Sequence, residues 1–314
     1  MLIPISFGVQ FSYKTLILKA QNFNDVQRLE TDGRELFLSP YQSQGGFLSD
    51  NISPLTVLFQ DGKAKTSTRL DLIEEEPLSI RVQGKPYAVV MRTPGDEPAH
   101  AAGFALAEGI LDSADDIETI GSCEGEVTNV VTLTVTQARL SMITAVLERR
   151  GFVSQTSCGI CGKELIEDLS QILRVLPDGP SIDLKEAYRC LESLEESQAL
   201  YRRTLASHAA AIYTPAFELL SLAEDVGRHN ALDKAIGKLL LKKTLDRAGI
   251  LILSSRISYE LVQKAARAKI PFIIAASRPT RLAVQLANSL NMTLASPSKE
   301  SGIHVYCGTG RLKT

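Results

Sequence analysis

Two cysteines three positions apart, Cys158 and Cys161, are the residues of this chain best suited to chemistry. They lie within residues 156–163, where most of the other positions are small and Lys163 closes the segment. The thiolate is the reactive form of cysteine, and a nearby cation or a helix N-terminus favours it. A helix-like pattern begins directly afterwards, at Glu164. The spacing therefore predicts a reactive sulfur centre.

Three other interpretations of the same spacing stay open: half of a zinc site, a thioredoxin-like redox pair, and two inert cysteines in a tight turn. A zinc tetrad needs further ligands, and the sequence has no second C-x-x-C and no H-x₃₋₅-H. The zinc deaminase signature is missing, because neither His100 nor His208 begins an H-x-E and Ser157 precedes the first cysteine. No P-loop motif is present either. We expect sulfur chemistry and no structural metal.

The bulk composition excludes several classes of protein. The chain has 314 residues, a formal net charge of −2 and five cysteines. This charge gives no overall electrostatic case for binding nucleic acid or an anionic membrane. An odd, sparse set of cysteines is not typical of a secreted disulfide framework. No segment approaches the ~18 consecutive apolar residues of a membrane span, and the start of the chain does not resemble a signal peptide. We expect a cytoplasmic protein.

The chain divides into three predicted parts. Residues 1–70 show no sustained periodicity, and we treat them as an N-terminal extension of unknown role. Residues 71–155 are predicted to form a small α+β domain. Its expected elements are strands at 78–82, 87–91 and 129–135, a turn at 83–85, and a helix over 99–111 with Asp96 as its N-cap.

Residues 156–314 are predicted to form an α/β domain that carries the C-x-x-C segment at its start. Short apolar strands alternate with helices, which indicates a sheet covered on both faces. The expected strands are 208–213, 217–222, 249–253 and 271–275, and the expected helices are 183–203, 228–242, 259–268 and 280–290. The predicted fold class is therefore α/β.

Two polar segments lie between a predicted strand and a predicted helix. Residues 224–234 combine a glycine turn with seven polar or ionisable side chains, and the helix that follows offers free N–H groups to an anion. Residues 254–260 combine serines with Arg256, a set suited to phosphate at the carboxyl end of a strand. The alternative for either segment is an ordinary helix start with a capping residue and surface salt bridges, which needs no ligand.

Taken together, these motifs resemble the formate dehydrogenase accessory sulfurtransferase family, of FdhD type. The segments that carry the resemblance are 92–96, 103–110, 157–162, 208–210, 224–230 with 233–234, 254–264 and 279–283. They span residues 72–306 and are specific in combination. The resemblance implies a C-terminal domain with the three-layer αβα fold of cytidine deaminases, and a homodimer.

The resemblance also implies a sulfur carrier. Such a protein accepts persulfide sulfur from a cysteine desulfurase and passes it to the molybdenum bis(guanine dinucleotide) cofactor, for maturation of formate dehydrogenase or a related molybdenum enzyme. We expect Cys158 to carry the persulfide and Cys161 to assist its transfer or resolve it. The alternative is a non-catalytic chaperone that only binds the cofactor.

Cationic side chains are expected to hold the pyrophosphates of this cofactor, because the chain as a whole is slightly acidic. The residues predicted to bind it are Arg228, His229, Lys234, Arg256, Lys264, Pro297, Ser298, Lys299, Glu300, Ser301 and Gly302. In the segment that corresponds to residues 297–302, the family normally has two arginines. This chain has neither, and its basic residue there is Lys299, near the position of the first arginine. A lysine is a point charge and cannot form the bidentate fork of an arginine.

Overall fold

The computed structural model describes residues 28–31, 34–37, 51–62, 64–122, 129–149 and 173–313, in two compact units, Met1–Gly46 and Phe47–Thr314. In the first unit, β1 (Arg28–Thr31) and β2 (Arg34–Phe37) form an antiparallel pair. All elements that follow belong to the second unit. The predicted boundary near residue 155 lies outside the described residues and stays a prediction.

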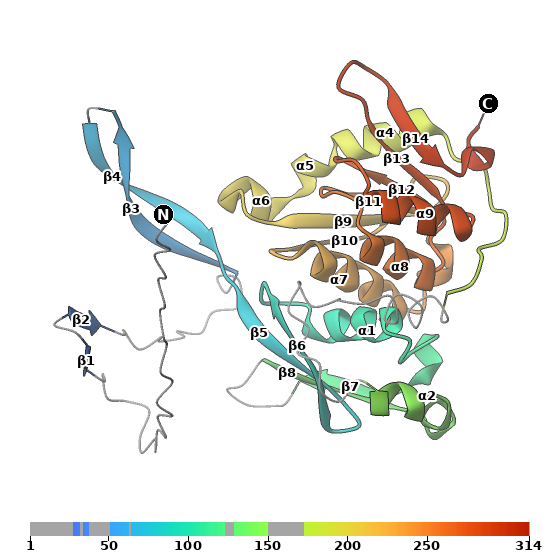
Figure 1. Ribbon diagram of the computed structural model, residues 1–314, viewed down its shortest axis with the longest axis horizontal. Coiled ribbons are helices and arrows are strands. Elements are labelled where there is room, and N and C mark those ends of the chain that lie inside the picture. Colours follow the sequence, from blue (N-terminus) through green and yellow to red (C-terminus); the bar gives the residue numbers. More distant parts are fainter. Residues whose placement is uncertain are drawn as a thin grey trace, which may run out of the picture. The chain divides into compact units, whose positions relative to one another are not determined.

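The second unit begins with a long antiparallel hairpin of β3 (Ile52–Asp61) and β4 (Ala64–Ile73), drawn in blue in Figure 1. The sequence did not predict these strands. Both faces of a two-stranded ribbon are open to solvent, so burial imposes no apolar alternation on it. Large side chains such as Leu55 and Phe59 are accordingly about half exposed.

A four-stranded sheet of order β6-β5-β8-β7 follows the hairpin. Its strands are β5 (Glu76–Val82), β6 (Lys85–Arg92), β7 (Ile117–Ser122) and β8 (Val130–Val135). The predicted turn between β5 and β6 is confirmed: Gln83 and Gly84 both have positive φ, 53° and 73°, as a two-residue hairpin turn requires. Leu78, Ile80 and Val82 alternate along β5 and are buried.

The helices that accompany this sheet are α1 (Glu97–Ala107) and α2 (Gln137–Arg149), with a short 3₁₀ turn, η1 (Ala114–Asp116). The sequence extended the first helix to residue 111, but Gly109 has a φ of 77° and ends it. Asp96 occupies the N-cap position as predicted, but its side chain does not cap the helix. It forms an ion pair with Lys238 instead, with Oδ2 and Nζ 2.8 Å apart.

The main sheet has six strands in the order β10-β9-β11-β12-β13-β14. They are β9 (His208–Tyr213), β10 (Leu219–Asp225), β11 (Ile250–Leu253), β12 (Phe272–Ala275), β13 (Thr293–Pro297) and β14 (Ile303–Cys307). Four of them, β10 to β13, run in one direction, and β9 and β14 run in the other. All four residues of β11 and of β12 are buried. Continuous apolar strands of this kind need cover on both faces.

Two layers of helices supply that cover (Figure 1). One layer contains α7 (Arg228–Leu241), α8 (Tyr259–Arg267) and α9 (Arg281–Ser289), and the other α4 (Leu184–Glu192), α5 (Leu194–Ser197) and α6 (Ala199–Thr204). Two more 3₁₀ turns are η2 (Leu245–Arg247) and η3 (Thr309–Arg311). The predicted α/β class is confirmed, while the long helix expected over 183–203 is three short helices.

The helices α1 and α7 pack with their backbones in contact. A Cβ added at Gly103 would lie 1.9 Å from the Asp233 carbonyl oxygen, and one at Gly237 would lie 1.7 Å from the Ala99 carbonyl oxygen. Only glycine fits at these two positions, and the contact joins the four-stranded sheet to the main sheet.

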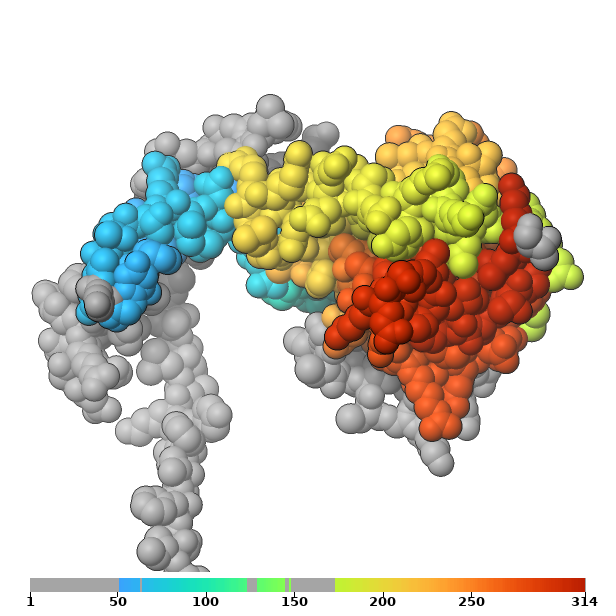
Figure 2. Space-filling view, turned by 90° about the horizontal axis from the view of Figure 1, so that it is seen from above, coloured from blue at the N-terminus to red at the C-terminus, as the bar shows by residue number. Residues whose placement is uncertain are grey.

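In Figure 2 the α4–α6 layer forms a continuous band that meets the β3–β4 hairpin, where Arg203 and Asp71 form an ion pair of 2.7 Å. Among the described residues, no helix is long and apolar enough to cross a membrane.

Candidate functional site

The shared direction of β10, β11 and β13 brings the predicted site segments to one edge of the main sheet. Residues 226–229 follow β10, residues 254–258 follow β11, and residues 298–302 join β13 to β14. His208 starts β9 at the same edge, because its register partner is Asp225. Carboxyl ends of strands are where open α/β sheets bind ligands.

Four cationic or potentially cationic side chains cluster at this edge. Burial lowers the pKa of His208, and the neighbouring charges of Arg228, His229 and Arg256 lower it further. Burial also lowers the pKa of Arg228, with the charge of Arg256 adding to the effect. Like charges held this close are suited to a bound anion. The Nε atom of Arg228 is buried and has no hydrogen-bond partner among the described residues, so it can donate to such an anion.

His229 is held from α8. Its Nε2 lies 2.9 Å from Glu260 Oε2 and 3.2 Å from Ser258 Oγ. The hydrogen bond from His229 is the main reason that the pKa of Glu260 is lowered, and it outweighs the opposing effect of burial. His229 and Arg228 are both half-buried at the start of α7, whereas Arg256 is exposed.

Lys234 is not at the surface of the site. Its ammonium lies 2.7 Å from Asp225 Oδ2 and donates to the Thr93 carbonyl oxygen, also at 2.7 Å. The other oxygen of Asp225 accepts from the Gly227 amide and from the Asn230 side chain. Lys234 thus anchors the carboxylate that shapes the turn before α7. This geometry favours a structural role over the predicted contact with cofactor phosphate.

Lys264 is also bound internally. Its ammonium lies 2.8 Å from both carboxylate oxygens of Asp233 and 5.6 Å from the centre of the Phe104 ring. Burial raises the pKa of Asp233, and Lys264 acts in the opposite direction. A buried carboxylate of this kind needs its cation. For Lys264, too, the structure favours an internal role over a ligand contact.

The segment of residues 92–96 braces the site from the four-stranded sheet. The Thr93 amide donates to Asp225 Oδ2, and the Thr93 hydroxyl accepts from the Val226 amide. Arg92 is fully buried, and its guanidinium lies 2.9 Å from Glu97 Oε1. This segment is one of those that carry the family resemblance. The contacts show what it supports: the turn that carries Arg228 and His229.

A pocket of about 540 Å³ adjoins the cationic edge. It is lined by Leu191, Glu192, Leu194, Glu195, Gln198, Tyr201, Leu205, Ala206, Ser207, His208, Ser254 and Ala276. Glu224 shapes one wall, because its carboxylate accepts from the Leu200 and Tyr201 amides and from the Ser207 hydroxyl. Sequence reasoning missed this pocket, since α4–α6 carry no motif that pointed to it.

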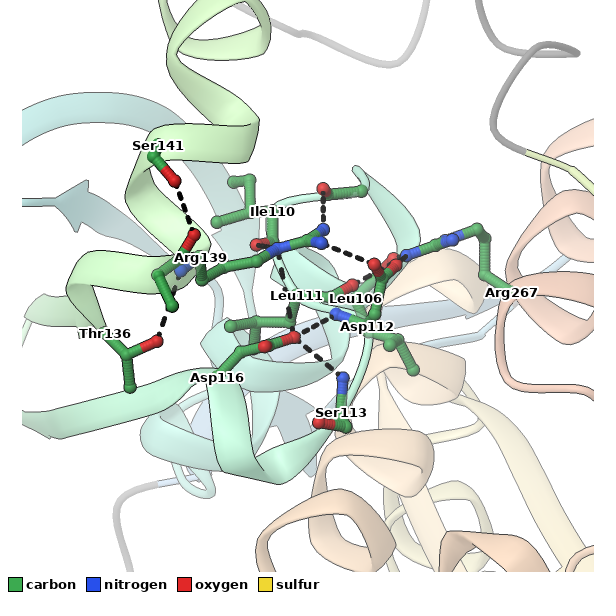
Figure 3. Close-up of polar contacts among 12 residues, drawn as sticks. Leu106, Ile110, Leu111, Asp112, Ser113, Asp116, Thr136, Arg139, Ser141 and Arg267 are labelled. Carbon is green, nitrogen blue, oxygen red and sulfur yellow. Dashed lines mark hydrogen bonds and ion pairs between the residues drawn. The ribbon is translucent and has the colours of Figure 1, made fainter.

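Two arginines clamp the C-terminal end of α1 (Figure 3). Arg139, on α2, donates to the carbonyl oxygens of Ile110 and Gly109, and Arg267, on α8, donates to those of Leu106 and Leu111. The Asp112 carboxylate is bound by both guanidiniums. The clamp fixes α2, the last described element before the cysteine segment, against α1 and α8.

Cys158 and Cys161 lie outside the described residues, so the predicted sulfur centre stays a prediction. Within the described ranges, no group of three or more His, Cys, Asp or Glu side chains is placed to hold a metal ion. In the predicted segment at 297–302, Pro297 ends β13 and residues 298–302 form the β13–β14 turn, closed by a hydrogen bond from the Ser298 amide to the Gly302 carbonyl oxygen. Its role in binding a cofactor also stays a prediction.

The sequence model of the FdhD/NarQ family matches residues 73–313, which include every segment of this edge. The chain belongs to the FdhD/NarQ family. Curated FdhD relatives called sulfur carrier protein include those of Streptomyces avermitilis, 40% identical over 78% of this chain and 90% of the relative, and Streptomyces coelicolor, 41% identical over the same shares. The relative from Mycobacterium tuberculosis is 37% identical over 77% of this chain and 91% of its own length.

The fold of this FdhD/NarQ member also has a counterpart among solved structures. A protein from Desulfotalea psychrophila, described as a formate dehydrogenase accessory protein, superposes with a TM-score of 0.66 and 21% identity. The match covers 83% of this chain and 99% of the other. At this identity the similarity establishes a shared α/β fold.

Proposed function

We propose that this FdhD/NarQ protein is a sulfur carrier for formate dehydrogenase maturation. It takes persulfide sulfur from a cysteine desulfurase onto Cys158 and delivers it to the molybdenum bis(guanine dinucleotide) cofactor. Relatives called sulfur carrier proteins, at 37–41% identity over most of the chain, support the sulfur chemistry. The observation that supports an anionic cofactor as the acceptor is the cationic edge around Arg228 and Arg256.

In this proposal the cationic edge and the pocket bind different parts of the cofactor. Arg228 and Arg256 bind pyrophosphate oxygens, with His208 and His229 beside them. The pocket of about 540 Å³ is of a size that takes a small organic group, and its mixed apolar and polar lining suits a purine base. The cofactor is cargo, bound only while sulfur is delivered.

The sulfur step is a thiol–persulfide exchange. The Cys158 thiolate attacks the outer sulfur of the donor persulfide, a new S–S bond forms, and the donor leaves as its thiolate. Delivery follows when the outer sulfur passes on to the cofactor and Cys158 returns to its thiolate. If Cys161 attacks instead, a disulfide forms and hydrosulfide leaves. The first route hands over sulfur at the level of elemental sulfur, so the acceptor supplies the two electrons that make it sulfide. The second route releases sulfide and leaves a Cys158–Cys161 disulfide, which a thiol reductant must reopen before the next round.

Labelled sulfur tests the carrier function. We would incubate the protein with a cysteine desulfurase and radiolabelled cysteine, and then map the label. Label on the Cys158–Cys161 peptide that is lost on reduction supports the proposal. Binding of the cofactor without any label would instead support a chaperone, which is the alternative function.

Binding of guanosine diphosphate tests the anion site separately. Arg256→Ala should weaken this binding, more strongly at low salt, because salt screens exposed charges. Unchanged affinity would remove the phosphate assignment without affecting the sulfur chemistry.

A homodimer and a cytoplasmic location belong to the same proposal. Size-exclusion chromatography with light scattering checks the first.

A further inference from the structure

The contacts of His229 fix the position of its ring proton. Nε2 faces two groups at once, Glu260 Oε2 at 2.9 Å and Ser258 Oγ at 3.2 Å. An ionised carboxylate can only accept hydrogen bonds, so the nitrogen beside it must carry the proton. The neutral ring is therefore the Nε2–H tautomer, and Nδ1 has its lone pair free.

This arrangement differs from a nucleophile relay. In such a relay the hydroxyl and the carboxylate bind opposite nitrogens of the imidazole, so that the ring can take the hydroxyl proton. Here Ser258 and Glu260 share Nε2. Because that nitrogen donates, it cannot remove a proton from the Ser258 hydroxyl. The geometry thus argues against Ser258 as a nucleophile. Nδ1 is then the nitrogen of His229 that can take up a proton.

Several charged groups surround His229. On its own helix, Arg228 and Asp233 are close enough to interact with the ring or its partners. His208 faces it from β9, and Lys264 lies on α8 with Glu260. Asp233 and Lys264 neutralise each other through their own ion pair. Glu260 supplies one negative charge beside the ring, and Arg228 and Arg256 supply two positive ones.

We propose that Glu260 is a positioning residue, which keeps Nε2 of His229 protonated, so that the ring takes up its second proton at Nδ1 when a phosphate oxygen binds beside Arg228. When the ring is protonated, Nδ1–H donates to that oxygen, and Glu260 balances the imidazolium charge. The inference rests on the anion-binding part of the proposed function, but its tautomer can be measured without any ligand.

Nitrogen-15 NMR of protein labelled at histidine tests the tautomer. The wild type should show His229 as Nε2–H when the ring is neutral. Glu260→Ala should give a mixture of tautomers, whereas Glu260→Gln should retain Nε2–H, because its amide oxygen still accepts. Ser258→Ala is the matched control and should leave the tautomer unchanged. Nδ1–H in the wild type, or an unchanged tautomer in Glu260→Ala, would overturn the proposal.

Calorimetry with guanosine diphosphate tests the consequence. Glu260→Ala should weaken binding about tenfold, the size expected for one hydrogen bond to a charged group, and Glu260→Gln should weaken it less. Glu218→Ala, which removes an exposed carboxylate paired with Arg247, should have no effect. Thermal melts confirm that each variant is folded.

The two hypotheses fail in different ways. If Arg256→Ala weakens binding and Glu260→Ala does not, the positioning role is wrong and the anion site remains. If neither variant changes the affinity, the anion site itself is wrong. Label on the cysteine peptide is independent of both results, so the carrier function is judged separately.

Discussion

Lys234 and Asp225 form an ion pair in which both side chains are almost fully buried, with Nζ and Oδ2 2.7 Å apart. The lysine comes from α7 and the aspartate from the end of β10. Thr93, which lies far earlier in the chain, contributes a carbonyl oxygen to the ammonium and an amide to the carboxylate. The pair therefore joins three segments behind the turn that carries Arg228 and His229.

Lys234→Met should destabilise the protein strongly. Removing one partner of a buried pair leaves an uncompensated charge, at a cost of about 3–5 kcal/mol. Denaturant unfolding followed by circular dichroism measures the loss. Lys243→Met is the control, because its pair with Asp115 is exposed and screened by solvent, so the loss of stability should be much smaller. Equal stability of the two variants would contradict the structural role given to Lys234.

Gly103→Ala should separate α1 from α7. The added Cβ would collide with the backbone of Asp233, which has no flexible end that could move away. Overpacking of this kind typically costs about 1–3 kcal/mol, and contact with backbone places the expected loss at or above the upper end. Gly121→Ala is matched in chemistry but faces open space, so it should be nearly neutral. Thermal melts of both variants decide whether the close approach exists.

Asp112 should make the clamp at the end of α1 sensitive to acid. Partial burial raises the pKa of Asp112, but hydrogen bonds and charges from Arg267 and Arg139 outweigh it, so the pKa is lowered overall. A carboxylate with a lowered pKa stabilises the fold at pH values above its unfolded pKa, and this contribution is lost as pH falls through the folded value. Asp112→Asn should therefore lower stability near neutral pH and converge with the wild type in acid. Melting temperatures measured from pH 7 down to pH 3 check this, and parallel curves would contradict it.

Cys158→Ala should abolish persulfide loading and leave the melting temperature unchanged. Cys161→Ala should impair delivery more than loading, because we assign it to the second step. Mass spectrometry before and after reduction measures the added sulfur. If only the Cys161 variant loses loading, the two roles are reversed.

Two truncations distinguish the contribution of the first compact unit to thermal stability from that of the β3–β4 hairpin. Removing residues 1–46 should leave the melt near the full-length value, because Phe47–Thr314 form one unit. Removing residues 1–68 deletes β3 and half of β4, so this truncation should lower the melting temperature. The loss is expected to be small, about 1 kcal/mol or some 2–4 °C, since the hairpin contacts the body mainly near Asp71. Identical melts for both truncations would show that the hairpin contributes nothing.

The sequence by itself determined β5, β6, α1 and β8, and the order of strands and helices from β9 to α9, because buried apolar runs such as Ile250–Leu253 leave a recognisable pattern. It missed β7 and α2. It also determined two polar segments, residues 224–234 and 254–260, which meet at one edge of the main sheet. It did not predict β3 and β4, whose exposed faces impose no pattern, nor the pocket beneath α4–α6.

Only the tertiary structure decided which cations are available. Lys234, Lys264, Arg228 and Arg256 look equivalent in the sequence, since all four are basic residues near a strand end. Folding binds Lys234 to Asp225 and Thr93, and Lys264 to Asp233, while Arg228 and Arg256 lie close to each other at the site. The difference is set by groups far away in the chain, and a buried ammonium must take whatever carboxylate or carbonyl packing places next to it.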